Sequence, residues 1–208
     1  MPRLFSFKPA ITFRGRKFRG VRGWAGKPMH PPLTDLPVAA YVFAAAFDVI
    51  SYIAWKGSEP NVSSLAHDSF VAATYVMIAG AVFSLGAALT GFWDWWKGIE
   101  RATSGPIGRA QHTQVWRTIN THASIMLTVT ALVVVDIVLR LTSFGEGYTD
   151  LPVMILSVVA AGLVVVGATY GGSLVYDYQF NVESLEGSTV WDETERDQLP
   201  TEHQKSEW

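Results

Sequence analysis

The chain has 208 residues, of which 49% are hydrophobic and 16% are charged, and its formal net charge is -2. A typical soluble domain carries about 25% charged residues, so this composition favours a membrane protein. The near-neutral balance gives no sign of nucleic-acid binding. Because the chain has no cysteine, it forms no disulfide, thiolate zinc site or cysteine-held iron–sulfur cluster of its own.

The first segment of the chain, residues 1–35, is basic and rich in proline and glycine. Its eight cationic side chains are Arg3, Lys8, Arg14, Arg16, Lys17, Arg19, Arg22 and Lys27. They interrupt any apolar stretch that would make a signal peptide. A tail lying on anionic lipid and a docking arm for a partner are both compatible with this pattern. At the other end, the acidic residues 179–208 predict a solvated tail.

Four long apolar stretches follow the basic segment, and each reaches the roughly 20 residues that a helix needs to cross about 30 Å of hydrocarbon. The predicted helices cover residues 36–55, 68–93, 119–142 and 151–176. Pro37 and Pro152 stand near the starts of the first and fourth stretches, where proline is well tolerated. The sequence therefore predicts an all-α integral membrane four-helix bundle over residues 36–178.

Lys and Arg side chains are concentrated on one side of the predicted bundle. The N-terminal segment carries eight and the loop 94–118 carries four, whereas the opposite side has only Lys56 and Arg140. Positively charged loops stay on the cytoplasmic side of a membrane. We therefore expect a multi-pass protein of the bacterial cytoplasmic membrane with both termini in the cytoplasm.

Small residues form stripes on the second and fourth predicted helices, and such stripes let helix backbones approach closely in lipid. The candidate packing positions are Gly80, Gly91, Gly167, Gly171 and Gly172. Packing within the bundle and a homodimer face are the two interpretations. The two hairpins also look alike, with Asp48 and Asp136 in similar apolar runs. This similarity indicates either a parallel duplication about an axis along the membrane normal or a chance likeness of common membrane residues.

Two histidines stand at the starts of the helices that run inward from the cytoplasmic side. Imidazoles from two helices of a bundle can ligate one haem iron, so His30 and His122 are candidate haem ligands, with His112 as an alternative. Another metal site, or interfacial histidines without any cofactor, would explain the same residues. Pro31 and Pro32 are expected to leave His30 outside a regular helix.

Asp48 and Asp136 lie within apolar helices, where an ionisable side chain is costly and is a functional candidate. Arg140 lies four residues after Asp136 and on the same face, which favours a structural role for Asp136. Asp48 is the candidate proton-relay carboxylate. Asp94 is expected at the cytoplasmic interface, near both histidines, where a binding site or a structural latch between helix ends would explain it equally well.

The run from His30 to Val38 resembles the opening motif of an uncharacterised bacterial membrane family, the domain-of-unknown-function family numbered twenty-two thirty-one. Residues 87–94, His122 and residues 171–176 follow in the same order of motifs, so the resemblance covers about 28–178. It implies a four-helix membrane domain that is sometimes fused to a Rieske-type iron–sulfur domain, and it implies no proven reaction. A chain without cysteine would need a separate Rieske-type partner.

The leading hypothesis is a redox or accessory subunit that binds b-type haem between His30 and His122 and exchanges electrons with a cytoplasmic partner. A small transporter or proton-conducting protein that uses Asp48 is one alternative, and a cofactor-free structural subunit is another. No phosphate-binding loop, dinucleotide fingerprint or nucleophile motif occurs. We therefore expect the protein to have no catalytic activity of its own. We also expect it to belong to a homo-oligomer or a larger membrane complex.

Overall fold

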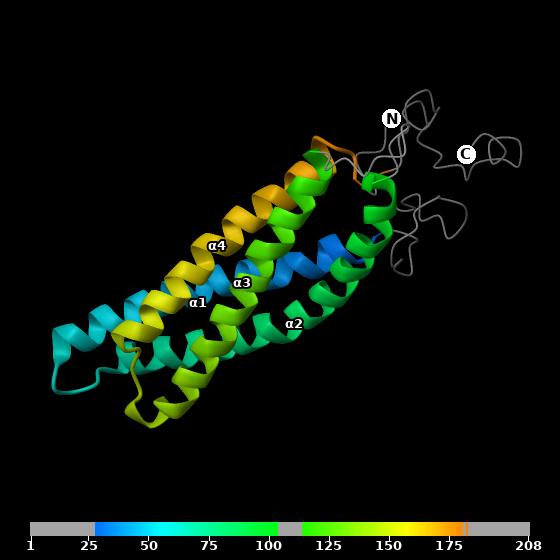
Figure 1. The fold of residues 1–208 in the computed structure, drawn as a ribbon. Coiled ribbons are helices and arrows are strands. Elements are labelled where there is room, and N and C mark those ends of the chain that lie inside the picture. Colours follow the sequence, from blue (N-terminus) through cyan, green and yellow to red (C-terminus); the bar gives the residue numbers. More distant parts are fainter. Residues whose placement is uncertain (1–27, 104–113, 181, 183–208) are drawn as a thin grey trace, which may run out of the picture.

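The computed structural model describes residues 28–103, 114–180 and 182, and within them the chain forms four long α-helices (Figure 1). The elements are α1 (His30–Ser58), α2 (Ser64–Thr103), α3 (Gln114–Thr142), the short 3-10 helix η1 (Phe144–Glu146) and α4 (Leu151–Tyr176). By length and composition, each α-helix contains a segment able to cross a membrane. The predicted all-α membrane bundle is confirmed.

The four helices form a ring in which each packs against two others. Within the described residues, the backbones of α1 and α3 each lie beside those of α2 and α4, whereas the backbones of α1 and α3 do not lie side by side, nor do those of α2 and α4. The turns of the hairpins α1–α2 and α3–α4 lie at the same end of the bundle, which we call the turn end (Figure 1). The helices α1 and α3 therefore stand parallel on one diagonal. This is the arrangement expected for two hairpins related by an axis along the bundle.

Only α4 has its predicted limits, because the other three helices extend past the apolar stretches that identified them. The expectation that His30 lies outside a regular helix was wrong, since α1 begins at His30 and not at Leu36. Pro31 and Pro32 lie in the first turn, where a missing N–H would have had no partner in the helix. Pro37 lies inside α1 rather than at its start. Hydropathy detects only the part of a helix that suits hydrocarbon, so polar helix ends escape it.

The middle of the bundle is closely packed around a glycine of α2. A Cβ atom built on Gly80 would lie 2.8 Å from Ala40 Cβ and 2.8 Å from Tyr41 Cε1 of α1. One turn further along α2, Ser84 shares a 2.6 Å hydrogen bond with the Tyr41 hydroxyl. The surrounding buried cluster consists of Tyr41, Ala44, Met77, Val129, Val133, Ala160 and Val164. Gly80 therefore allows the close approach of α1 and α2 that small residues provide in membranes.

Large apolar side chains cover the outside of the bundle, and a small group of charged side chains is buried inside it. Leu89 is 74% exposed and Leu127 is 69% exposed, whereas Asp48, Asp136 and Arg140 are fully buried. Exposed apolar surface on this scale is costly in water and suits contact with lipid. The distribution of side chains therefore agrees with a protein embedded in a bilayer.

We predict that Gly80→Ala destabilises the bundle by about 1–3 kcal/mol, because the new methyl group has no room beside α1. Gly162→Ala is the matched control, since a Cβ there meets nothing within 4 Å and both substitutions gain the same helix propensity. Denaturant unfolding in detergent micelles measures the difference. Equal stability of the two variants would contradict the close packing at Gly80.

Candidate functional site

The two candidate histidines meet across the bundle. His30 begins α1, His122 lies in α3, and the centroids of their rings are 6.3 Å apart with an angle of 84° between the ring planes. Because α1 and α3 stand on one diagonal, both side chains point into the space between the four helices. We call this end of the molecule, opposite the turn end, the histidine end.

Each imidazole is held by a carbonyl of the neighbouring helix. His30 Nδ1 lies 2.9 Å from the carbonyl oxygen of Ala87, and His122 Nδ1 lies 2.8 Å from that of Gly167. A carbonyl oxygen only accepts hydrogen bonds, so Nδ1 of each ring is the donor. In the neutral imidazole, Nε2 then keeps its lone pair and is the atom available to bind a metal.

A glycine lies beside each imidazole, four residues after the carbonyl that holds it. A Cβ on Gly91 would lie 2.6 Å from His30 Cε1, and a Cβ on Gly171 would lie 3.2 Å from His122 Cε1. The histidine, the carbonyl and the glycine thus recur in the same arrangement in both hairpins. This repeated set of contacts supports the internal duplication that the sequence indicated.

The two histidines also define which positions of the hairpins correspond. Asp48 lies eighteen residues after His30, and Arg140 lies eighteen residues after His122. On this alignment Asp136 corresponds to Ala44 and not to Asp48. The sequence comparison that placed the two aspartates together was therefore offset by about one helical turn, and the equivalent residues carry opposite charges.

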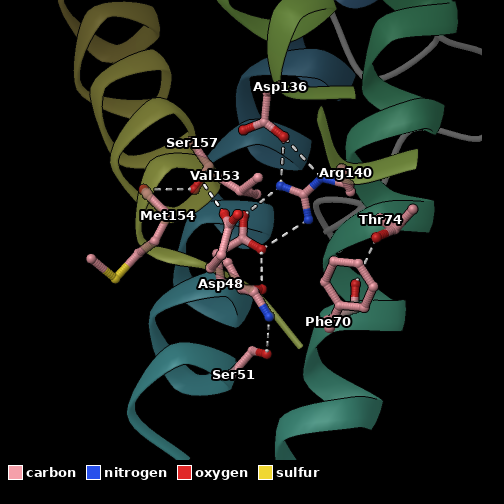
Figure 2. A network of polar contacts seen from close by, with 11 residues as sticks. Asp48, Ser51, Phe70, Thr74, Asp136, Arg140, Val153, Met154 and Ser157 are labelled. Atoms are coloured by element: carbon pink, nitrogen blue, oxygen red, sulfur yellow. Dashed lines mark hydrogen bonds and ion pairs between the residues drawn. The ribbon is translucent and has the colours of Figure 1, made fainter. Parts of the chain in front are cut away.

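A buried charged triad lies toward the turn end of the bundle, and Figure 2 shows the Arg140 guanidinium between Asp48 and Asp136. Arg140 Nη1 and Nη2 donate to the two carboxylate oxygens of Asp48 at 2.8 and 2.7 Å. Arg140 Nε donates to Asp136 Oδ1 at 2.8 Å, and Nη2 lies 2.7 Å from the same oxygen. The pair of Asp136 and Arg140 expected from their spacing is present, and Asp48 joins it from the diagonal helix.

Two hydroxyl side chains connect the triad to the rest of the bundle. Thr149, in the loop before α4, donates from Oγ1 to Asp48 Oδ1 at 2.9 Å and from its backbone N–H to Ser51 Oγ at 3.0 Å. Ser51 Oγ in turn donates to the carbonyl oxygen of Ala66 on α2 at 2.7 Å. The Phe70 ring of α2 lies under the guanidinium, with 6.0 Å between its centroid and Arg140 Cζ. All these groups are held in one connected network.

The remaining candidates have different surroundings. Gly167 faces α3, where its Cβ would lie 2.6 Å from Met126 Sδ, whereas Gly172 meets only Tyr176 of its own helix, at 4.0 Å. Asp94 is buried in α2, with 7% of its surface exposed. Near it, Trp95 Nε1 donates to Asn120 Oδ1 at 3.1 Å and so links α2 to α3. His112, like the basic residues 1–27 and the acidic tail from 183, lies outside the described residues.

Sequence reasoning missed the contact between Asp48 and Arg140 and the roles of Ser51 and Thr149. One signal was available, because a carboxylate inside an apolar helix requires a cation at the same depth. Arg140 and Lys56 were the only cations expected on that side, and Arg140 lies as far from His122 as Asp48 lies from His30. Ser51 and Thr149 carry no such signal, because single hydroxyl residues are common in membrane helices and loops.

The fold and its buried polar contacts define an integral membrane protein built from two similar helical hairpins. The chain belongs to the family described as "Predicted membrane protein (DUF2231)", whose model matches residues 26–184. The resemblance noted in the sequence is thus confirmed over the whole helical part. A search of curated proteins and a search of solved structures found no match to the chain.

We predict that Arg140→Met destabilises the protein by about 3–5 kcal/mol, because it leaves two buried carboxyl groups without their cation. The control is Lys56→Met, which removes an ion pair with Glu59 whose side chains are 45% and 52% exposed. Exposed pairs of this kind contribute about 0–1 kcal/mol. Unfolding in mixed micelles measures both variants, and a loss at Arg140 no larger than that at Lys56 would contradict the structural role of the triad.

Proposed function

We propose that this protein binds a b-type haem between His30 and His122 and serves as an electron-transfer or accessory subunit of a membrane redox system. One observation carries the proposal: two imidazoles from diagonal helices meet inside the bundle, and each has its Nδ1 occupied by a carbonyl. Metal-binding histidines characteristically donate their second ring N–H to a carbonyl or carboxylate, which fixes the ring. Both imidazoles already make that bond.

The separation of the rings agrees with shared coordination of one iron. An imidazole nitrogen binds a first-row metal at about 2 Å and the ring centre lies about 1 Å behind it, so His30 and His122 would hold one metal ion between them with their ring centroids roughly 6 Å apart. The observed distance is 6.3 Å. The two histidines would therefore need little rearrangement to hold a metal ion between them.

The number of protein ligands favours haem over a bare metal ion. Within residues 28–103, 114–180 and 182, no group of three or more His, Cys, Asp or Glu side chains is placed to hold a metal. Structural zinc sites take four protein ligands and catalytic ones take three. His30 and His122 would suffice to hold a haem, because the porphyrin supplies the other nitrogens.

The bound haem would supply one-electron chemistry, and the residues of this chain would set its surroundings. The carbonyls of Ala87 and Gly167 orient the imidazoles and make them better ligands. Gly91 and Gly171 make room for the rings themselves, because a Cβ at either position would lie 2.6 or 3.2 Å from Cε1 of the neighbouring imidazole. The apolar helices around the pair would keep water from the iron and so influence its reduction potential.

The expected orientation would place the histidine end on the cytoplasmic side of the membrane, so the electron partner would act at that face. A Rieske-type protein is the partner that the family resemblance favours, and it would have to be a separate chain. The alternative of a proton relay through Asp48 has less support, because both oxygens of that carboxylate are already bound by Arg140 and one also by Thr149.

We predict that the protein, expressed with added haem precursor and purified in detergent, shows a Soret band and, once reduced, the sharp visible bands of six-coordinate low-spin haem. His30→Gly and His122→Gly should each abolish the six-coordinate spectrum, and added imidazole should restore it by filling the vacated position. His67→Gly is the control and should leave the spectrum unchanged.

The absence of any Soret band in folded protein would overturn the haem proposal. The two histidines would then form a cofactor-free latch between the diagonal helices, as in a structural subunit. In that case His30→Gly and His122→Gly would each lower the stability of the protein without any change in its absorption spectrum.

A further inference from the structure

We propose that Asp136 is a proton-binding site, with a carboxylic acid proton on Oδ2 held inside the bundle while Asp48 and Arg140 remain an ion pair. The site is distinct from the histidine pair, because Asp136 lies fourteen residues after His122, about 21 Å along the helix. The proposal therefore does not depend on haem binding.

The two carboxyl groups of the triad are bound in different ways. Asp48 receives a donor at each oxygen, with Nη1 and Thr149 Oγ1 at Oδ1 and Nη2 at Oδ2. Asp136 receives both of its arginine contacts at the same oxygen, Oδ1, and its Oδ2 is buried without a hydrogen-bond partner. A carboxylate accepts equally at both oxygens, whereas a carboxylic acid accepts best at its carbonyl oxygen and carries hydrogen on the other. Asp48 thus has the contacts of a carboxylate, whereas Asp136 has one oxygen, Oδ2, that receives no donor and on which a proton can sit.

Charge balance leads to the same assignment. If both aspartates were ionised, the triad would hold two negative charges and one positive charge at 0% exposure. An uncompensated charge buried in an apolar interior costs far more than a neutral polar group. One bound proton makes the triad neutral, and Oδ2 of Asp136 is the carboxyl oxygen that no donor occupies.

The charged residues around Asp136 also favour its protonated form. Asp48 faces it from α1, Arg140 from α3, and Asp150 lies at the start of α4, while α2 contributes the uncharged Phe70 ring. Arg140 bonds both oxygens of Asp48 but only one oxygen of Asp136. The cation therefore stabilises a negative charge on Asp136 less than one on Asp48. The expected site binds one proton.

Infrared spectroscopy of the full chain, labelled with [4-13C]aspartate, tests the site directly. The sample is purified in a maltoside detergent, which has no ester carbonyl, and is measured at about pH 5.5, where exposed carboxyl groups with pKa values of about 4 are still ionised. The expected spectrum contains a carboxylic acid C=O band that the label moves to lower wavenumber. In Asp136→Glu the band should remain but no longer respond to the aspartate label, and in the matched variant Asp48→Glu it should still respond.

The absence of a carboxylic acid band in the folded wild type would overturn the proposal, since both aspartates would then be ionised. A label-sensitive band that persists in Asp136→Glu and disappears in Asp48→Glu would overturn it as well, because the proton would then sit on Asp48. Should Asp136→Glu fail to fold, Asp136→Asn replaces it, since an amide oxygen can still accept from Arg140. The folded Asn variant should lack the band, and a retained label-sensitive band would again overturn the assignment.

Discussion

The ion pair between Arg140 and Asp48 constrains the arrangement of the two hairpins more than any other contact. It joins the diagonal helices α1 and α3, which have no direct backbone contact. Neither charge can be left alone at this depth of an apolar bundle, so the two helices are fixed in the one register that brings them together. The same register places His30 opposite His122, because each histidine lies eighteen residues, about 27 Å of helix, before its charged residue.

Polar contacts thus connect the diagonal helices at two levels, and small residues bring the neighbouring helices together between them. The histidine pair lies at one level and the charged triad at the other, while Gly80 and Gly167 allow close packing of α1 with α2 and of α3 with α4. Lipid offers no hydrophobic driving force between helices, so close packing and hydrogen bonds must provide the association energy. The bundle uses both kinds of contact.

The sequence was sufficient for features that depend on local patterns. Hydropathy located all four spans, and the i, i+4 spacing identified the contact between Asp136 and Arg140. His30 and His122 were predicted at one end of the bundle because each stands at the start of an inward-running helix, and the structure brings them together there. The contact between Asp48 and Arg140 joins residues 92 positions apart, so it depends on which helices share a diagonal. The helical position of His30 was missed because the prolines that follow it disfavour a helix interior but not its first turn.

The opposite charges at equivalent positions have a consequence for how such a bundle can be assembled. Two copies of the first hairpin, related by a true twofold axis, would bring Asp48 against another Asp48, and two copies of the second would bring Arg140 against another Arg140. The first assembly would bury two carboxylates without a cation, and in the second the two guanidinium groups would have only the Asp136 carboxyl group of their own helix as a partner. The hairpin α1–α2 therefore cannot take the place of the hairpin α3–α4. Within the single chain Asp48 meets Arg140 instead, so the two halves are complementary rather than identical.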